Sequence, residues 1–277
     1  MIQPLNKILD WSSKGREIVS DIFKLDKELA KQLVRLREGF GLCAVKAEFE
    51  AEGASFRDLV RLRRITIQHD IPLYLKIGGA EAIRDIKDAF ELGVDGLIAP
   101  MIESPFAAAK FLNACKSIYG EQKIFKSINV ETCQAAENIE GLLKMASNSI
   151  DNITIGRTDL SHSYFDEKIQ PDSEFILDLI ESLGRKVVAT GLTLTIGGSI
   201  TKASIECFRR RSKEWTKQIA SLETRKIILP ADIMLGKAGA LEGAIKFEEL
   251  YLRSKLETET MLTKSDRGRL DKLKNRL

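Results

Sequence analysis

The chain has 277 residues, 44% of them hydrophobic, which is enough to bury the core of one large α/β domain. Its 43 basic and 40 acidic residues give a net charge of +3, and this near balance argues against binding to nucleic acid or to an anionic membrane. No stretch approaches the roughly 18 apolar residues of a membrane span, and the four cysteines have neither zinc-site nor disulfide-scaffold spacing. We therefore expect a cytoplasmic protein with a small-molecule partner.

Apolar, β-rich runs alternate with amphipathic stretches along the chain, as is typical of repeated βα units around a parallel sheet. A helix is predicted first, over 26–37. Seven strands follow, predicted at 42–49, 73–77, 96–101, 124–131, 152–156, 186–196 and 225–229. Seven further helices are predicted at 56–68, 81–92, 105–117, 136–146, 173–183, 202–222 and 240–254.

Seven βα units favour a single (β/α)8 TIM barrel over residues 1–277, with one strand unrecognised. We expect that strand near the N-terminus, short or irregular, because residues 1–25 contain no clear β run. An open, doubly wound sheet is the alternative, but no glycine-rich GxGxxG loop supports it. The strongly charged segment 248–277 predicts an extra C-terminal helix, either solvated or packed on a neighbouring subunit of a homo-oligomer.

Charged residues follow the first two predicted strands, where the site of a parallel barrel lies. Lys46, Glu48 and Glu50 are spaced two apart and would share one face of a regular strand. A functional site would explain charges among apolar neighbours, and a Lys46–Glu48 ion pair beside a solvated acidic loop is the structural alternative. Lys76 precedes Gly78 and could neutralise a substrate carboxylate.

Two carboxylates stand at the ends of the next pair of neighbouring strands. Glu131 ends one apolar run, and Asp159 follows another in a short turn that begins at Gly156. Hard divalent cations bind oxygen ligands, so a cation and an oxo acid could bind here. The amide groups from Gly156 to Asp159 could also point at an anion.

Three motifs resemble the HpcH/HpaI aldolase and citrate lyase family of the phosphoenolpyruvate/pyruvate-domain superfamily. They lie at 93–104 (GVDGLIAPMIES), 130–132 (VET) and 155–161 (IGRTDLS), and the resemblance runs from about residue 26 to 229. It implies a (β/α)8 fold with Mg²⁺ or Mn²⁺ on Glu131 and Asp159. The amides of Thr158 and Asp159 would hold the carboxylate of pyruvate, oxaloacetate or a phosphoenolpyruvate-like acid.

The chain departs from the family pattern at two positions. Lys76 stands where the aldolases have arginine, and a lysine lacks the planar fork that holds a carboxylate and an enolate oxygen together. Arg157, beside the metal ligand, is our candidate to compensate. The family histidine after the first strand is absent, so His162, Glu48 and Glu50 remain the candidates for the acid/base group.

The resemblance implies a metal-dependent carbon–carbon lyase or aldolase that uses the pyruvate-like enolate of a 2-oxo acid and an unidentified aldehyde or acyl acceptor. One alternative is a citrate lyase β-like enzyme that acts on a CoA thioester. The other is a non-catalytic barrel that serves as a binding or assembly module. Two acids that repel each other at a strand rim argue against that last hypothesis.

Overall fold

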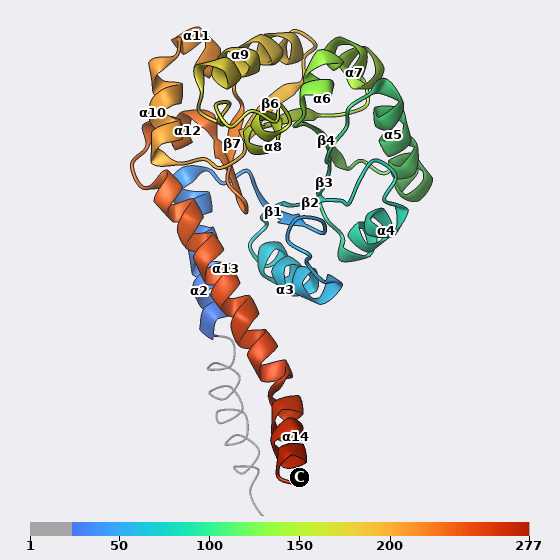
Figure 1. Cartoon of the computed structure of the whole chain (residues 1–277), viewed down its shortest axis with the longest axis vertical. Coiled ribbons are helices and arrows are strands. Elements are labelled where there is room, and N and C mark those ends of the chain that lie inside the picture. The colour runs from blue at the N-terminus through green and yellow to red at the C-terminus, as the bar shows by residue number, and fades with distance from the viewer. Residues whose placement is uncertain (1–23, 277) are drawn as a thin grey trace, which may run out of the picture.

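Eight strands close into a barrel in the order β1 to β8, with helices around its outside (Figure 1). The structure is a computed structural model and describes residues 24–276. The strands are β1 Ala44–Glu48, β2 Leu73–Lys76, β3 Gly96–Ala99, β4 Phe125–Val130, β5 Asn152–Gly156, β6 Thr193–Gly197, β7 Ser221–Glu223 and β8 Ile227–Pro230. The predicted α/β barrel is therefore confirmed.

Several helices begin where the sequence supplies a capping side chain. Ser55 and Asp58 form a capping box at α3, and Ser104 caps α5 just before Pro105. The helices are α2 Lys24–Phe40, α3 Phe56–Ile67, α4 Ile83–Leu92, α5 Pro105–Tyr119, α6 Cys133–Glu137, α7 Ile139–Ala146, α8 Arg157–His162, α9 Glu174–Val188, α10 Lys202–Arg210, α11 Lys213–Thr216, α12 Ala231–Gly236, α13 Ala240–Leu262 and α14 Lys264–Lys274. The strand predicted at 186–196 was wrong in its first part, because α9 continues to Val188.

The strand missing from the prediction is β7, and it is not near the N-terminus. It lies at the end of the range 202–222, which was predicted as one helix and instead contains α10 and α11. β8 runs antiparallel to both β7 and β1, so the strand predicted at 225–229 has the opposite direction to a regular barrel strand. β7 was not recognised in the sequence because its three residues are too few to show a hydrophobic period. Residues 1–23, where the missing strand was expected, lie outside the described residues.

The β7–β8 hairpin changes which residues reach the carboxyl end of the barrel. β7 ends there and β8 begins there, so the tight turn of Thr224, Arg225 and Lys226 lies at that end. In a regular βα unit a helix would follow β7 and these positions would lie elsewhere. The hairpin thus adds two basic residues to the rim.

Alternation along the strands separates an apolar layer from a polar one. Leu97, Ile128 and Ile153 face the helices and are almost fully buried. Their neighbours in sequence, such as Asn129 and Thr154, face the barrel axis and are also buried. The interior is therefore polar, whereas barrel interiors are usually filled with branched apolar side chains.

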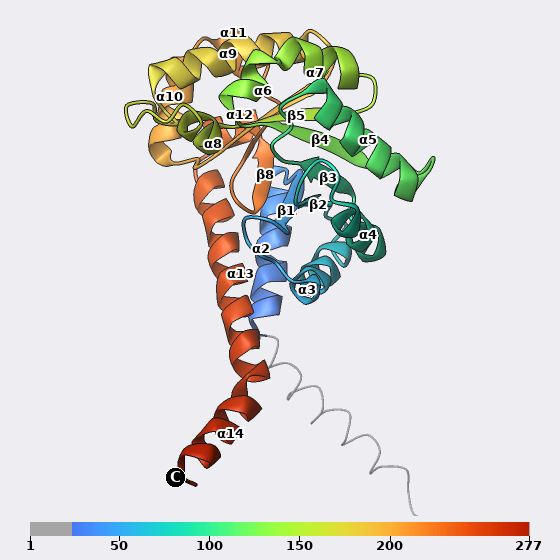
Figure 2. The same ribbon diagram turned by 45° about the vertical axis from the view of Figure 1, so that its right-hand side comes forward.

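The C-terminal helices extend away from the barrel, with α13 lying along α2 (Figures 1 and 2). Gln32 Nε2 donates to the carbonyl oxygen of Gly243 at 2.8 Å, and a Cβ at position 243 would lie 3.1 Å from Leu36. Beyond this contact α14 has no buried residue. The extra C-terminal helix is confirmed, while its packing on another subunit stays a prediction. No helix within residues 24–276 is long and apolar enough to cross a membrane.

Candidate functional site

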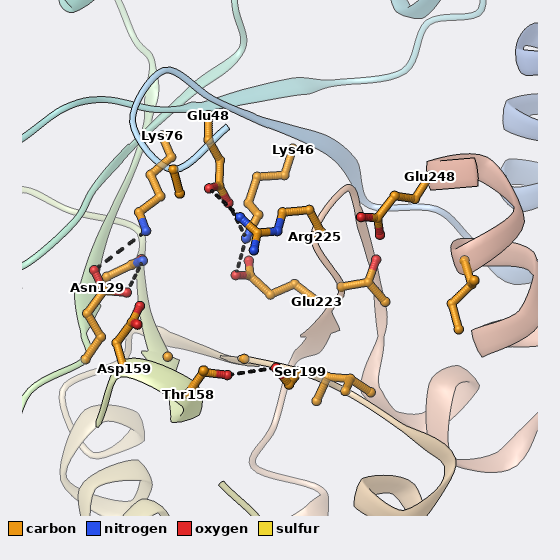
Figure 3. Close-up of a pocket in the computed structure, with 17 residues that line it drawn as sticks. Lys46, Glu48, Lys76, Asn129, Thr158, Asp159, Ser199, Glu223, Arg225 and Glu248 are labelled. Atoms are coloured by element: carbon orange, nitrogen blue, oxygen red, sulfur yellow. Dashed lines mark hydrogen bonds and ion pairs between the residues drawn. The ribbon is translucent and has the colours of Figure 1, made fainter. Parts of the chain in front are cut away.

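A cavity of about 350 Å³ opens at the carboxyl ends of the strands (Figure 3). Residues from six strands or the segments that follow them, and from α13, meet in it. Its charged lining residues are Lys46, Glu48, Lys76, Glu131, Asp159, Glu223, Arg225 and Glu248. Strand ends far apart in sequence thus bring the predicted acids and Lys76 into one cavity.

Glu131 is held firmly at the end of β4. It is 2% exposed, and its two carboxylate oxygens accept hydrogen bonds from the Met101 amide and from Asn129 Nδ2, each at 3.0 Å. Burial raises the pKa of Glu131; Lys76 and the two hydrogen bonds oppose this, and Asp159 adds to it. An additional positive charge beside Glu131 would therefore stabilise its ionised form.

The residues around Glu131 fit a divalent cation. The Asn129 Oδ1 atom is buried and has no hydrogen-bond partner within residues 24–276. A Cβ on Gly156 would lie 2.9 Å from Glu131 Oε2, so glycine leaves room for the carboxylate. Glu131, Asn129 and Asp159 offer only oxygen donors, and Mg²⁺ needs one or two carboxylates besides substrate and water. The described residues contain no group of three or more His, Cys, Asp or Glu side chains suited to a metal.

Lys76, at the end of β2, lines the same side of the cavity as Asn129 and Asp159 (Figure 3). Its Nζ lies 3.8 Å from Glu131 Oε1 and 3.7 Å from Glu50 Oε2. Glu50 is exposed at the mouth and does not belong to the cavity lining. The ammonium group of Lys76 is thus a point charge beside Glu131 and Glu50, and it lines the cavity where an anionic ligand could contact it.

Arg157 does not point into the cavity, so our expectation that it compensates for Lys76 is corrected. Its guanidinium is fully buried and donates to the carbonyl oxygens of Gly197 and Gly198 at 3.1 and 2.6 Å. It also pairs with Asp172 and lies 5.0 Å from the ring centroid of Phe208. Arg157 therefore supports the turn after β6.

The three acid/base candidates occupy different places. His162 is exposed at the end of α8 and does not line the cavity, and Glu50 lies at its mouth. Glu48 is 3% exposed and lines the cavity. Of the three, the structure brings only Glu48 to the site.

A buried ion cluster surrounds Glu48, and Figure 3 shows its members pointing toward one another. Lys46 Nζ lies 2.7 Å from Glu223 Oε1 and 3.3 Å from Glu48 Oε1. Arg225 Nη1 lies 3.4 Å from Glu48 Oε2. Burial alone would raise the pKa of Glu48, but Lys46, Lys76 and Arg225 outweigh it, so the pKa is lowered. The carboxylate is therefore charged at neutral pH.

Glu223 was missed in the sequence because most of β7 lay in the helix predicted at 202–222. Arg225 was missed because it began the strand predicted at 225–229, and in a parallel sheet that position would lie at the end away from the site. The signal was the spacing of Ser221 and Glu223, which places two polar side chains on one face of a strand just before a turn. A segment of three residues contains only one such pair, which is too little to establish an alternating pattern.

The turn after β6 lies directly against the amides that were predicted to bind a carboxylate. Gly198 has φ +84°, and a Cβ there would lie 2.5 Å from the Thr158 nitrogen. Ser199 has φ +48°, and its hydroxyl is 3.0 Å from the Thr158 hydroxyl. This left-handed, crowded turn leaves space for only a hydrogen at position 198.

Replacing Gly198 with alanine is expected to destabilise the protein by about 2 kcal/mol or more, because the new Cβ meets both a left-handed backbone and the Thr158 amide. Urea unfolding would measure this. Gly39→Ala is the matched control, since Gly39 lies within α2 with nothing within 4 Å of an added Cβ. That variant should gain up to about 1 kcal/mol. Equal stability of the two variants would contradict the geometry at position 198.

Comparison with solved structures places this barrel in a known class of fold. It is similar to an HpcH/HpaI aldolase from Desulfitobacterium hafniense DCB-2, with a TM-score of 0.55 and 15% identity over 82% of this chain and 87% of that chain. It is also similar to the citrate synthase SbnG, with a TM-score of 0.52 and 16% identity over 69% of this chain and 78% of that chain. RipC from Yersinia pestis has a TM-score of 0.50 and 16% identity, over 74% and 87% of the two chains.

These matches establish the fold, and they agree with the family that the three sequence motifs resemble. No family model matches the sequence. No curated protein matches it either. Because fold alone does not define function, the side chains of the site are what indicate the chemistry.

Proposed function

We propose that the chain is a divalent-metal-dependent carbon–carbon lyase or aldolase that acts on a 2-oxo acid such as pyruvate through its enolate. The observation that carries the proposal is the buried Glu131 carboxylate, fixed by two hydrogen bonds beside the unpartnered Asn129 Oδ1 and in one cavity with Asp159. The similarity of the fold to an aldolase and to a citrate synthase supports it.

Each side chain has a role that follows from its place. Glu131, Asp159 and Asn129 would hold Mg²⁺ or Mn²⁺, which when bound would stabilise negative charge on the enolate oxygen. Lys76, whose Nζ lies 3.8 Å from Glu131 Oε1, would neutralise the substrate carboxylate. The amides of Thr158 and Asp159 would orient that carboxylate in the cavity that Glu48 also lines.

Glu48 is the proposed general base, which takes a proton from C3 and returns it. Replacing it with glutamine is expected to slow metal-dependent C3 exchange by about 10²- to 10⁴-fold while leaving metal affinity unchanged. His162→Gln is the control, because His162 lies outside the cavity lining. A larger loss in the His162 variant than in the Glu48 variant would reverse the assignment.

The test of the whole proposal is exchange of the pyruvate methyl protons in D₂O, followed by NMR with and without Mg²⁺ or Mn²⁺. Enolisation requires no knowledge of the second substrate, so the result isolates the first chemical step. Metal-dependent exchange is the expected result. Absence of both exchange and metal binding in calorimetry would favour a binding module, and metal binding without exchange would favour a CoA thioester as substrate.

Which aldehyde or acyl acceptor binds depends on the shape of the cavity, whose lining includes Arg225, Glu248 and Ser199. The homo-oligomer and the cytoplasmic location remain predictions.

A further inference from the structure

Below the ion cluster, the barrel axis is occupied by hydroxyl groups joined in a hydrogen-bonded row. The Thr195 hydroxyl lies 2.8 Å from that of Ser221 and donates to Asn152 Oδ1 at 3.0 Å. Asn152 Nδ2 in turn donates to the Ser127 hydroxyl at 2.8 Å, and that hydroxyl lies 3.2 Å from Thr154 Oγ1. Strands β4 to β7 thus contribute one continuous polar layer.

This layer borders a second cavity, of about 160 Å³. We call it the lower cavity, and the cavity that contains Glu131 and Asp159 the upper cavity. The stacked rings of Tyr74 and Phe125, with centroids 4.5 Å apart, form its apolar wall. Cys43 and Thr193 also line it, and both are exposed at the amino ends of their strands. The lower cavity is large enough and polar enough for several water molecules, and it reaches solvent at the amino end of the barrel.

Glu223 connects the two cavities. It is 5% exposed and lines both of them. One of its oxygens, Oε1, accepts from Lys46, while Oε2 is buried with no hydrogen-bond partner in the described part of the chain. Ser221 lies two residues earlier on the same face of β7, toward the lower cavity. An unpaired buried carboxylate oxygen at this point indicates a donor that the protein itself does not supply.

We propose that the lower cavity holds water and carries protons between Glu48 and solvent through Lys46 and Glu223. The inference rests on the proposed enolisation. After Glu48 has taken a proton from C3, it gives that proton to Lys46, and Lys46 simultaneously gives one of its own to Glu223. Glu223 then loses the proton to water in the lower cavity, and hydronium leaves past Thr193. Lys46 is protonated before and after, and Glu48 and Glu223 return to carboxylates.

The route matters because a bound substrate would cover the exposed part of Glu48. Glu48 is almost fully buried even without a ligand, and pyruvate in the cavity that it lines would shield it further. The contacts from Glu48 to Lys46, at 3.3 Å, and from Lys46 to Glu223, at 2.7 Å, are direct and involve no ligand atom. They remain available while substrate is bound.

The experiment removes single hydroxyls from the lower cavity without touching the upper one. Thr195→Val and Ser221→Ala interrupt the hydroxyl pair beneath Glu223, and Thr66→Val is the matched control, a fully buried threonine of α3 whose hydroxyl is bonded at 3.1 Å to a backbone carbonyl. The rate of metal-dependent pyruvate exchange is expected to fall about tenfold in the two cavity variants with KM unchanged. The solvent isotope effect should rise, and imidazole should restore the rate.

Normal exchange rates in both cavity variants, with the unmodified protein active, would overturn the conduit and leave the proposed function intact. A slower rate with an unchanged isotope effect and no rescue by imidazole would also overturn it, since that is what altered packing would produce. Absence of metal-dependent exchange in the unmodified protein would overturn the proposed function, and the conduit with it.

Discussion

Replacing Glu131 with glutamine is expected to reduce metal-dependent pyruvate exchange by about 10³-fold and to weaken Mn²⁺ binding in calorimetry. Glutamine keeps the shape of the side chain and can still accept from the Met101 amide, so the fold should survive. It loses the charge that a dication requires and leaves Lys76 without its buried partner. Asp159→Asn is expected to have the same effect on metal binding.

The matched control is Glu248→Gln, because Glu248 lines the same cavity from α13, away from Asn129 and Asp159 (Figure 3). This variant should keep its dependence on metal. Full activity in both Glu131→Gln and Asp159→Asn would rule out the proposed metal site. An equal loss in all three variants would mean that the cavity responds to its total charge rather than to two particular ligands.

Replacing Lys46 with methionine is expected to destabilise the protein by about 3–5 kcal/mol, measured by urea unfolding. The substitution leaves Glu48 and Glu223 buried without the ammonium group that both contact. Arg225 offsets part of this for Glu48 only, at 3.4 Å and from a half-exposed position. Lys46 helps to lower the pKa of Glu48, so the loss should be largest at neutral and higher pH and should shrink in acid, where Glu48 becomes protonated.

Lys186→Met provides the comparison for that prediction. Lys186 forms an ion pair with Glu140 at 2.8 Å, and both side chains are exposed to solvent, unlike the buried partners of Lys46. An exposed pair of this kind contributes about 0–1 kcal/mol. Equal stability of the two methionine variants would contradict the prediction. It would mean that Glu48 and Glu223 do not become uncompensated buried charges when Lys46 is removed.

The sequence by itself determined the class of fold and the two acids of the proposed metal site. Strands and helices long enough to show a period repeat along the chain, so the barrel and most of its helices could be predicted. Glu131 and Asp159 each end an apolar run, and in a parallel sheet such positions meet at one edge. Lys76 could be placed in the same way.

Only the tertiary structure decided what surrounds them. β7 has three residues and forms an antiparallel hairpin with β8, which no local pattern specified, and this hairpin supplies Glu223 and Arg225. Arg157 lies two residues before Asp159 in α8, yet its side chain does not line the cavity, because the carbonyls of Gly197 and Gly198 and the carboxylate of Asp172 satisfy it elsewhere. Sequence position fixes which strand end a residue occupies, whereas the partners available in three dimensions fix where its charge is stable.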